Sequence, residues 1–365
     1  MGLKYFIQLY LALISTPLNL KKSTMTKSIT FILIVTLALG CKKKETEKIE
    51  TIPEKMNSKG SIEVVDQRLK DVLNTEARIE VIAEGYDWSE GPLWLEEQDM
   101  LIFSDVPRNT IYSWSEKEGA GVYLSPSGFT RENFEGSEPG SNGLALNNNG
   151  ELVICQHGNR QVSVMKAGLD KPEPSYKALA SSYEGKRFNS PNDLIFDKAG
   201  NLYFTDPPYG LPQQMEDPGK EINYQGVFRV TPEGQISLLT DELSRPNGLA
   251  LSPDEKTLYV ANSDPEKAIW MSYSLNEAGE VADKKVFFDA TERVPKASGL
   301  PDGLKIDNQG NVFATGPGGV WIFSPEGTHL GTIKTGEATA NCAFNEDKSA
   351  LFMTADGYIL RLRIK

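Results

Sequence analysis

The chain has 365 residues, a formal net charge of −12 and 39% hydrophobic residues. Its hydrophobic content is sufficient for a sizeable core, and its length suits either two average domains or one closed repeat fold. The acidic balance, with no basic stripe in the body of the chain, argues against nucleic-acid binding.

Residues 1–41 resemble a bacterial lipoprotein signal. Lys27 supplies a positive start, an apolar run covers 29–39, and Cys41 closes the segment. The run is too short to span a bilayer comfortably. We therefore expect an exported periplasmic lipoprotein that reaches the membrane only through a lipid on Cys41, and Lys42 after it favours the outer membrane. An ordinary cleaved signal and an uncleaved anchor are the alternatives.

The next segment, 42–75, is rich in lysine and glutamate and nearly free of aromatic residues. Such a composition cannot bury enough apolar surface to fold, so we expect a charged, flexible tether. The folded domain is then expected at 76–365.

One pattern recurs along this domain: a polar head residue, a short apolar run, a polar turn and a second apolar run. Examples are RPNGLALSPDEKTLYVAN at 245–262 and PNDLIFDKAGNLYFTD at 191–206. Successive heads are 52, 50, 55, 55 and 39 residues apart. A period near fifty indicates a repeat architecture. The heads are Glu90, Asn142, Asn192, Asn247, Asp302 and Asn341.

Each repeat contains four short β-rich runs separated by turn signals, which predicts four antiparallel strands. In the second repeat these runs are 144–146, 152–155, 161–165 and 176–180. The last repeat is one strand short, and an unused strand, 78–83, precedes the first. If that strand completes the sixth blade, the ring closes and no long edge is left bare. The sequence therefore predicts an all-β, six-bladed β-propeller.

In a propeller the first strand of each blade lines the central channel, so the heads should meet at one mouth. Carboxylate and amide oxygens suit Ca²⁺ better than zinc, and Glu90 with Asp302 would balance a divalent ion. Asn-Gly and Asp-Gly are also ordinary turn signals, an interpretation we keep for Asn142 and Asn341. The second strands should end at the same mouth, at Asp105, His157, Asp206, Asn262 and Asp356.

Several motifs resemble signatures of the senescence-marker-protein/gluconolactonase family, whose members are calcium-dependent six-bladed propellers. The resemblance covers about residues 78–365, and two of the motifs are similar to the bacterial gluconolactonase branch in particular. It implies a Ca²⁺-dependent hydrolase that opens a sugar lactone such as gluconolactone. The motifs are EGP at 90–92, HGNR at 157–160, SPNDL at 190–194, DPPYG at 206–210, RPNGL at 245–249 and PDGL at 301–304.

The resemblance also implies roles for single residues. It assigns the metal to Glu90, Asn247 and Asp302, and it gives Asp302 the further role of proton acceptor and donor. Asn192 is expected to reach the substrate and often the metal, and Asp193 to contact the substrate.

Other residues at the expected mouth are candidates for substrate binding. His157 is either a proton shuttle or a hydrogen-bonding rim residue, and Asp206 and Tyr209 are expected to form walls of the site. An arginine that binds sugar lactone in animal members is replaced here by Ser190. This departure leaves the identity of the lactone open.

Two rival functions remain at this point. The same ring of oxygen ligands could serve a phosphotriesterase-like hydrolase, or the propeller could be a non-catalytic module that binds a protein or glycan. The main expectation is a monomer that acts on a small-molecule lactone.

Overall fold

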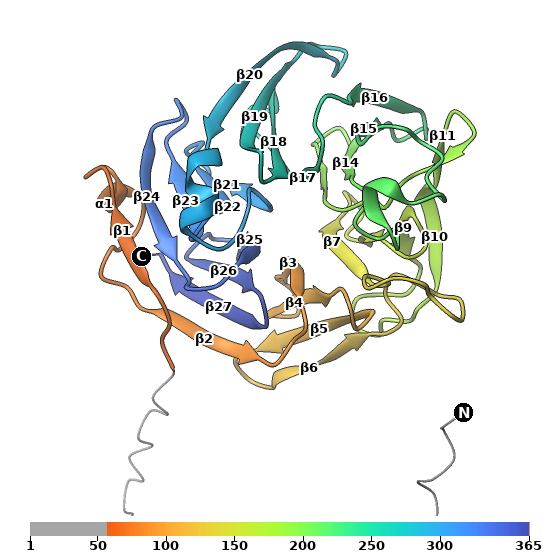
Figure 1. Ribbon diagram of the computed structural model, residues 1–365. Coiled ribbons are helices and arrows are strands. Elements are labelled where there is room, and N and C mark those ends of the chain that lie inside the picture. Colours follow the sequence, from red (N-terminus) through yellow and green to blue (C-terminus); the bar gives the residue numbers. More distant parts are fainter. Residues whose placement is uncertain (1–56, 365) are drawn as a thin grey trace, which may run out of the picture. The chain divides into compact units, whose positions relative to one another are not determined.

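The strands are arranged as six sheets around a central axis in this computed structural model, which describes residues 57–364 (Figure 1). The innermost strands contact one another in cyclic order, β3–β7–β13–β17–β21–β25 and back to β3, so the ring is closed. The prediction of an all-β, six-bladed β-propeller is therefore confirmed. The signal with Cys41, and 42–56 of the predicted tether, lie outside the described residues.

Blades 1 and 2 are four-stranded antiparallel meanders whose first strand is innermost. Blade 1 consists of β3 (Ser89–Leu95), β4 (Met100–Asp105), β5 (Thr110–Ser115) and β6 (Gly119–Leu124). Blade 2 consists of β7 (Ser141–Leu146), β8 (Leu152–Gln156), β9 (Gln161–Met165) and β10 (Tyr176–Ala180), followed by a small hairpin of β11 (Ser182–Tyr183) and β12 (Lys186–Arg187).

Blades 3 and 4 repeat this arrangement. Blade 3 consists of β13 (Leu194–Phe196), β14 (Leu202–Asp206), β15 (Gly226–Val230) and β16 (Ile236–Thr240), with the 3₁₀ turn η1 (Gln214–Glu216) between β14 and β15. Blade 4 consists of β17 (Pro246–Leu251), β18 (Thr257–Asp264), β19 (Lys267–Leu275) and β20 (Val281–Asp289), and the 3₁₀ helix η2 (Thr291–Lys296) follows it.

Blades 5 and 6 each recruit a strand from the N-terminal part of the chain. Blade 6 contains β25 (Thr339–Phe344), β26 (Ala350–Ala355) and β27 (Tyr358–Arg363), and β2 (Ile79–Glu84) is its outermost strand. The predicted closure by the strand at 78–83 is thus confirmed. Blade 5 contains β21 (Leu304–Ile306), β22 (Val312–Gly316), β23 (Gly319–Phe323) and β24 (His329–Lys334).

A fifth strand on blade 5 corrects the predicted boundary of the tether. Residues of β1 (Ser61–Val64) pair antiparallel with β24, and the short helix α1 (Leu69–Val72) follows. Leu69 and Leu73 are fully buried in the core between blades 5 and 6. The prediction of a flexible tether is therefore wrong from residue 57 onward, because these leucines and the strand pairing tie the segment to the propeller.

The core is divided into six apolar clusters, one between each pair of neighbouring blades. Side chains alternate along each strand, so Leu101 of β4 packs toward blade 6 while Ile102 packs toward blade 2. Each blade thus buries both faces, and the ring holds together without a central apolar core. No helix of the described part is long and apolar enough to cross a membrane.

Candidate active site

The head residues converge where the innermost strands begin. Glu90 and Asn247 are buried within β3 and β17, and each of these strands changes register directly after its head, between Glu90 and Leu93 and between Pro246 and Leu249. Such bulges re-aim a side chain and are frequent beside active sites. The bulges therefore turn the side chains of Glu90 and Asn247 away from the direction that a regular strand would give them.

The glycine that follows a head residue allows the inner strands of neighbouring blades to approach each other closely. A Cβ at Gly143 would lie 2.8 Å from the Asn192 carbonyl oxygen, and one at Gly303 would lie 2.0 Å from Cγ of Asn341. Asn142 and Asn341 lie within β7 and β25, not in turns. The turn interpretation of these two heads is therefore wrong, because both lie in inner strands at places where neighbouring blades touch.

Electrostatics single out the two carboxylate heads. Burial, followed by the charges of Asp193 and Glu138, raises the pKa of Glu90 to about 8. The pKa of Asp302 is likewise raised well above its ordinary value, by burial first and then by the charges of Glu90 and Asp193. Like charges that are near one another disfavour the ionised form and raise the pKa of both carboxyl groups. Glu90, Asp302 and Asp193 therefore influence one another electrostatically.

Two buried oxygens in this ring have no hydrogen-bond partner in the described part of the chain, Asp302 Oδ1 and Asn142 Oδ1. Asn247 Nδ2 donates to Ser263 Oγ at 2.9 Å, which leaves its Oδ1 as a free acceptor. Buried acceptors without a donor are costly unless a cation or water satisfies them. The donor set therefore fits a hard divalent cation, with Asn142 as an additional oxygen that the sequence argument had placed in a turn.

A metal centre made only of His, Cys, Asp and Glu is not present among residues 57–364, where no three such side chains are grouped to hold an ion. The candidate site differs from such a centre because half of its predicted ligands, Asn192 and Asn247, are amides. Asn192 is buried, and its carbonyl oxygen accepts the N–H of Gly143 from the neighbouring blade at 2.7 Å. Mixed carboxylate and amide ligands are typical of Ca²⁺.

Comparisons with known proteins assign the chain to a family. Residues 88–357 match the SMP-30/Gluconolactonase/LRE-like region. The chain belongs to this family. A gluconolactonase from Zymomonas mobilis is 43% identical over 84% of this chain and 86% of its own length.

Solved structures of the same kind share the propeller. A gluconolactonase from Xanthomonas campestris has a TM-score of 0.72 and 30% identity, and the match covers 85% of this chain and 98% of that one. A calcium-binding regucalcin from Agrobacterium tumefaciens has a TM-score of 0.61 and 18% identity, with 78% of this chain and 92% of that one covered, which shows a common fold. All six head residues lie inside the segment that matches the SMP-30/gluconolactonase family.

One expected substrate contact takes a different role in this family member. Asp206, at the end of β14, is fully buried, and its two carboxylate oxygens accept the N–H groups of Asn189 and Ser190 at 2.7 and 2.8 Å. Asp105 and Asn262 bind the loops before β3 and β17 in the same way. Asp206 therefore uses its oxygens to fix the loop that carries Asn192, and its expected place in a wall of the site stays a prediction.

Tyr209 and Ser190 belong to the same loop system. Ser190 Oγ donates to the carbonyl of Pro207 at 2.6 Å and accepts the N–H of Gly210 at 2.9 Å. Burial, and then the charge of Asp302, raises the pKa of the Tyr209 hydroxyl. Ser190, which stands where the resemblance implies an arginine, thus fixes the loop on both sides of Tyr209. Tyr209 lies close to Asp302 and is partly exposed.

Asp193 lies inside the ring and is bound on both oxygens. Oδ1 accepts the N–H of Leu194 at 2.9 Å and Oδ2 accepts Asn341 Nδ2 at 3.4 Å. Asp193 is buried, as is its neighbour Asn192. These bonds hold its charge beside Glu90 and Asp302; a direct contact with substrate stays a prediction.

Sequence reasoning missed Ser263. Its hydroxyl accepts Asn247 Nδ2 and donates to the carbonyl of Pro301, next to Asp302. Ser263 therefore links two predicted metal ligands from neighbouring blades. Its place directly after Asn262, at the end of a second strand, was the only sequence signal for it.

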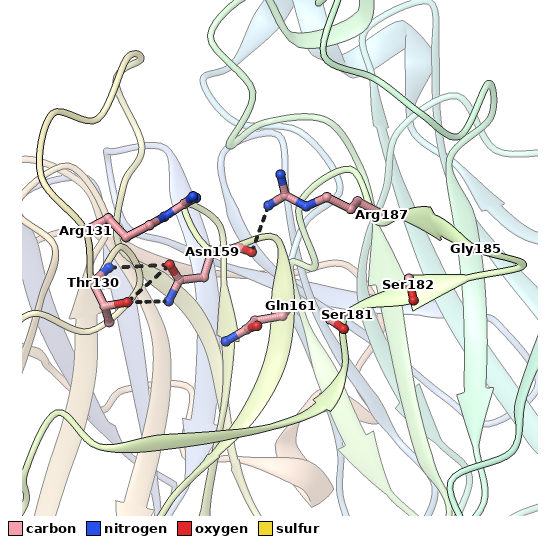
Figure 2. A pocket seen from close by; sticks show the side chains of 8 residues that line it. All are labelled: Thr130, Arg131, Asn159, Gln161, Ser181, Ser182, Gly185 and Arg187. Atoms are coloured by element: carbon pink, nitrogen blue, oxygen red, sulfur yellow. Dashed lines mark hydrogen bonds between the residues drawn. The ribbon is translucent and has the colours of Figure 1, made fainter.

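Figure 2 shows the side chains that line a polar groove of about 570 Å³. Arg187 Nη2 donates to the carbonyl of Asn159, whose side chain pairs with Thr130. A neighbouring groove of about 430 Å³ shares Arg131 and Arg187 and reaches Gly210, next to Tyr209. Neither groove is lined by a predicted metal ligand. The first is lined by Thr130, Arg131, Asn159, Gln161, Ser181, Ser182, Gly185 and Arg187.

Proposed function

We propose that this protein is a Ca²⁺-dependent hydrolase that opens a sugar lactone such as gluconolactone. Support comes from its membership of the SMP-30/gluconolactonase family and from a gluconolactonase relative at 43% identity. The observation that carries the proposal is the pair Glu90 and Asp302, whose raised pKa values and buried, unpartnered Asp302 Oδ1 fit a divalent cation.

The ion would be held by four oxygen-bearing side chains, Glu90, Asn192, Asn247 and Asp302. Once bound, a divalent cation there supplies Lewis-acid polarisation of the lactone carbonyl and stabilises the developing oxyanion. Other divalent cations share this ligand preference, and Ca²⁺ is favoured because a relative of the same fold is named as a calcium-binding protein.

Asp302 is the proposed general base. It accepts a proton from the water that attacks the carbonyl carbon, and the proton passes to the ring oxygen as the ester C–O bond breaks. The product is the open-chain hydroxy acid. Asp302 suits this role because it is the partly exposed member of the head residues, whereas Glu90 is buried.

The proposal includes a cellular location and an oligomeric state. The signal-like segment ending at Cys41 supports export and a lipid anchor in the outer membrane, facing the periplasm. The protein would act there as a monomer on a small lactone, and it would have no nucleic-acid partner.

A pH-stat assay against a panel of lactones and a phosphotriester tests this function. We expect acid release from sugar lactones, its loss with a chelator and its recovery with Ca²⁺. Asp302→Asn should lower kcat by at least about 100-fold while the protein remains folded. Hydrolysis of the phosphotriester alone would favour the phosphotriesterase-like alternative, and no hydrolysis of any ester would favour a binding module.

A further inference from the structure

Glu138 lies at the end of the long connection between β6 and β7, and this connection is firmly held. Asn109 Oδ1 accepts the N–H groups of Ser127, Gly128 and Phe129 at 3.2, 2.7 and 3.1 Å. At the other end of the connection, the N–H of Gly140 donates to the carbonyl of Val106 at 2.9 Å. Glu138 is therefore carried by an anchored segment.

Backbone bonds join this segment to the HGNR motif. The N–H of His157 donates to the carbonyl of Gly140 at 3.1 Å, and the N–H of Gly158 donates to the carbonyl of Pro139 at 3.3 Å. They place the imidazole beside the carboxylate, with His157 Nδ1 3.1 Å from Glu138 Oε2. From the sequence, His157 is a candidate without a partner. The structure shows that Glu138 lies beside it.

The His157 ring is packed against the loop that carries Tyr209. His157 is fully buried, and a Cβ on Gly210 would lie 2.6 Å from the His157 Cβ. Neither imidazole nitrogen makes a hydrogen bond of good geometry in the part of the chain described, and Nδ1 is the nitrogen that faces Glu138. The approach of Nδ1 to Glu138 Oε2 is therefore the contact through which this buried ring can act on a neighbour.

Glu138 lies on the segment that leads directly into β7, four positions before its head residue Asn142. The backbone bonds of Pro139 and Gly140 fix this segment at the end of the ring where β7 begins, and the charge of Glu138 is felt by Glu90, Asp302 and Tyr209. Within residues 57–364, His157 is the only basic side chain at ion-pair distance from it. The Glu138 side chain is 27% exposed, so part of it remains accessible to a ligand.

We propose that Glu138 accepts hydrogen bonds from hydroxyl groups of the lactone substrate, and that His157 is the residue that positions it. A carboxylate can accept from two neighbouring hydroxyls, so this pair would select polyhydroxylated lactones over unsubstituted ones. The inference rests on the proposed lactonase function and adds a specificity-determining residue to it.

The test compares gluconolactone with δ-valerolactone, which has the same ring without hydroxyl groups. For Glu138→Gln, kcat/KM for gluconolactone should fall roughly 10- to 100-fold more than the value for δ-valerolactone. Where δ-valerolactone turns over slowly, its inhibition constant against gluconolactone replaces the rate. The matched control is Glu135→Gln, an exposed acid on the same connection, which should leave the ratio unchanged.

His157→Ala should produce the same selective loss, and His157→Gln, which can still donate to the carboxylate, should recover part of it. The double variant Glu138→Gln/His157→Ala should be no worse than the single variants if the two residues act as one unit. Equal losses on both lactones, or no loss, would overturn the inference and leave the lactonase proposal intact. A wild-type protein that hydrolyses no lactone would overturn both.

Discussion

Asn341 and Asp193 meet across the propeller axis: Asn341 Nδ2 donates to Asp193 Oδ2 at 3.4 Å, although 148 positions separate them in the sequence. Asn341 belongs to blade 6, and Asp193 leads into blade 3 on the opposite side of the ring. Asn341 Oδ1 also accepts the N–H of Cys342 at 2.9 Å. A head residue interpreted as a turn former from sequence is thus a cross-channel contact.

Replacement of Asn341 by leucine should destabilise the fold. The change removes the acceptor of the Cys342 N–H and leaves the buried Asp193 carboxylate short of a donor, which costs about 1–3 kcal/mol. Urea unfolding followed by tryptophan fluorescence measures the loss. Asn149→Leu, in an exposed turn, should change stability by less than about 0.5 kcal/mol; similar losses for both would contradict the cross-channel role.

Calcium should raise the thermal stability of the wild-type protein. A ligand at 100 times its Kd stabilises the folded state by about 2.7 kcal/mol, which moves Tm by a few degrees for a domain of this size. Glu90→Gln should remove the shift, because the ring loses one of its full charges. Glu97→Gln, exposed in the β3–β4 turn, is the control and should keep it. A shift that survives in Glu90→Gln would place the calcium elsewhere.

Without divalent cations, stability should fall as pH rises. The folded-state pKa of Glu90 is raised from 4.5 to about 8, so between these values the folded protein binds more protons than the unfolded chain. The favourable contribution is complete below the lower value and is lost toward the higher one. Chemical unfolding with a chelator at about pH 5 and about pH 9 should therefore show a larger decline for wild type than for Glu90→Gln. Parallel declines would argue against a perturbed Glu90.

Gly303→Ala should be strongly destabilising. The new Cβ would lie 2.0 Å from Asn341 Cγ, and overpacking of this kind costs about 1–3 kcal/mol or more. Gly121→Ala is the matched control, since a Cβ there meets nothing within 4 Å. Thermal unfolding of the two variants gives the comparison, and equal Tm values would show that the inner strands separate easily.

Shortening a buried side chain of the N-terminal segment that contains β1 and α1 should weaken the core between blades 5 and 6. Leu73 is fully buried, and Leu73→Ala should lower the free energy of unfolding by about 2–5 kcal/mol. Lys70→Ala, on the exposed side of α1, should have little effect. A neutral Leu73→Ala would mean that the segment before β2 is not part of the cooperative fold.

The repeat, the number of blades and the closing strand could be predicted from the amino-acid sequence. They depend on strand-length apolar runs and turn signals, which are local, and on a period near fifty, which is visible in one dimension. The oxygen-bearing heads could be named for the same reason, since the first strand of every blade must line the axis. Family signatures then separated Glu90, Asn247 and Asp302 from the other heads.

Other features depended on contacts between distant parts of the chain. Leu69 and Leu73 stand in a segment whose charged composition predicts a solvated tether. They are buried because β1 pairs with β24, which lies some 270 residues later in the chain. The same Asn-Gly pair suits a turn or a close approach between blades, and only the neighbouring backbone decides between them. Asp206 binds backbone N–H groups of its own blade, and Glu138 lies beside His157. The directions of these side chains depend on how the loops pack, and the repeat period of the sequence carries no information about loop packing.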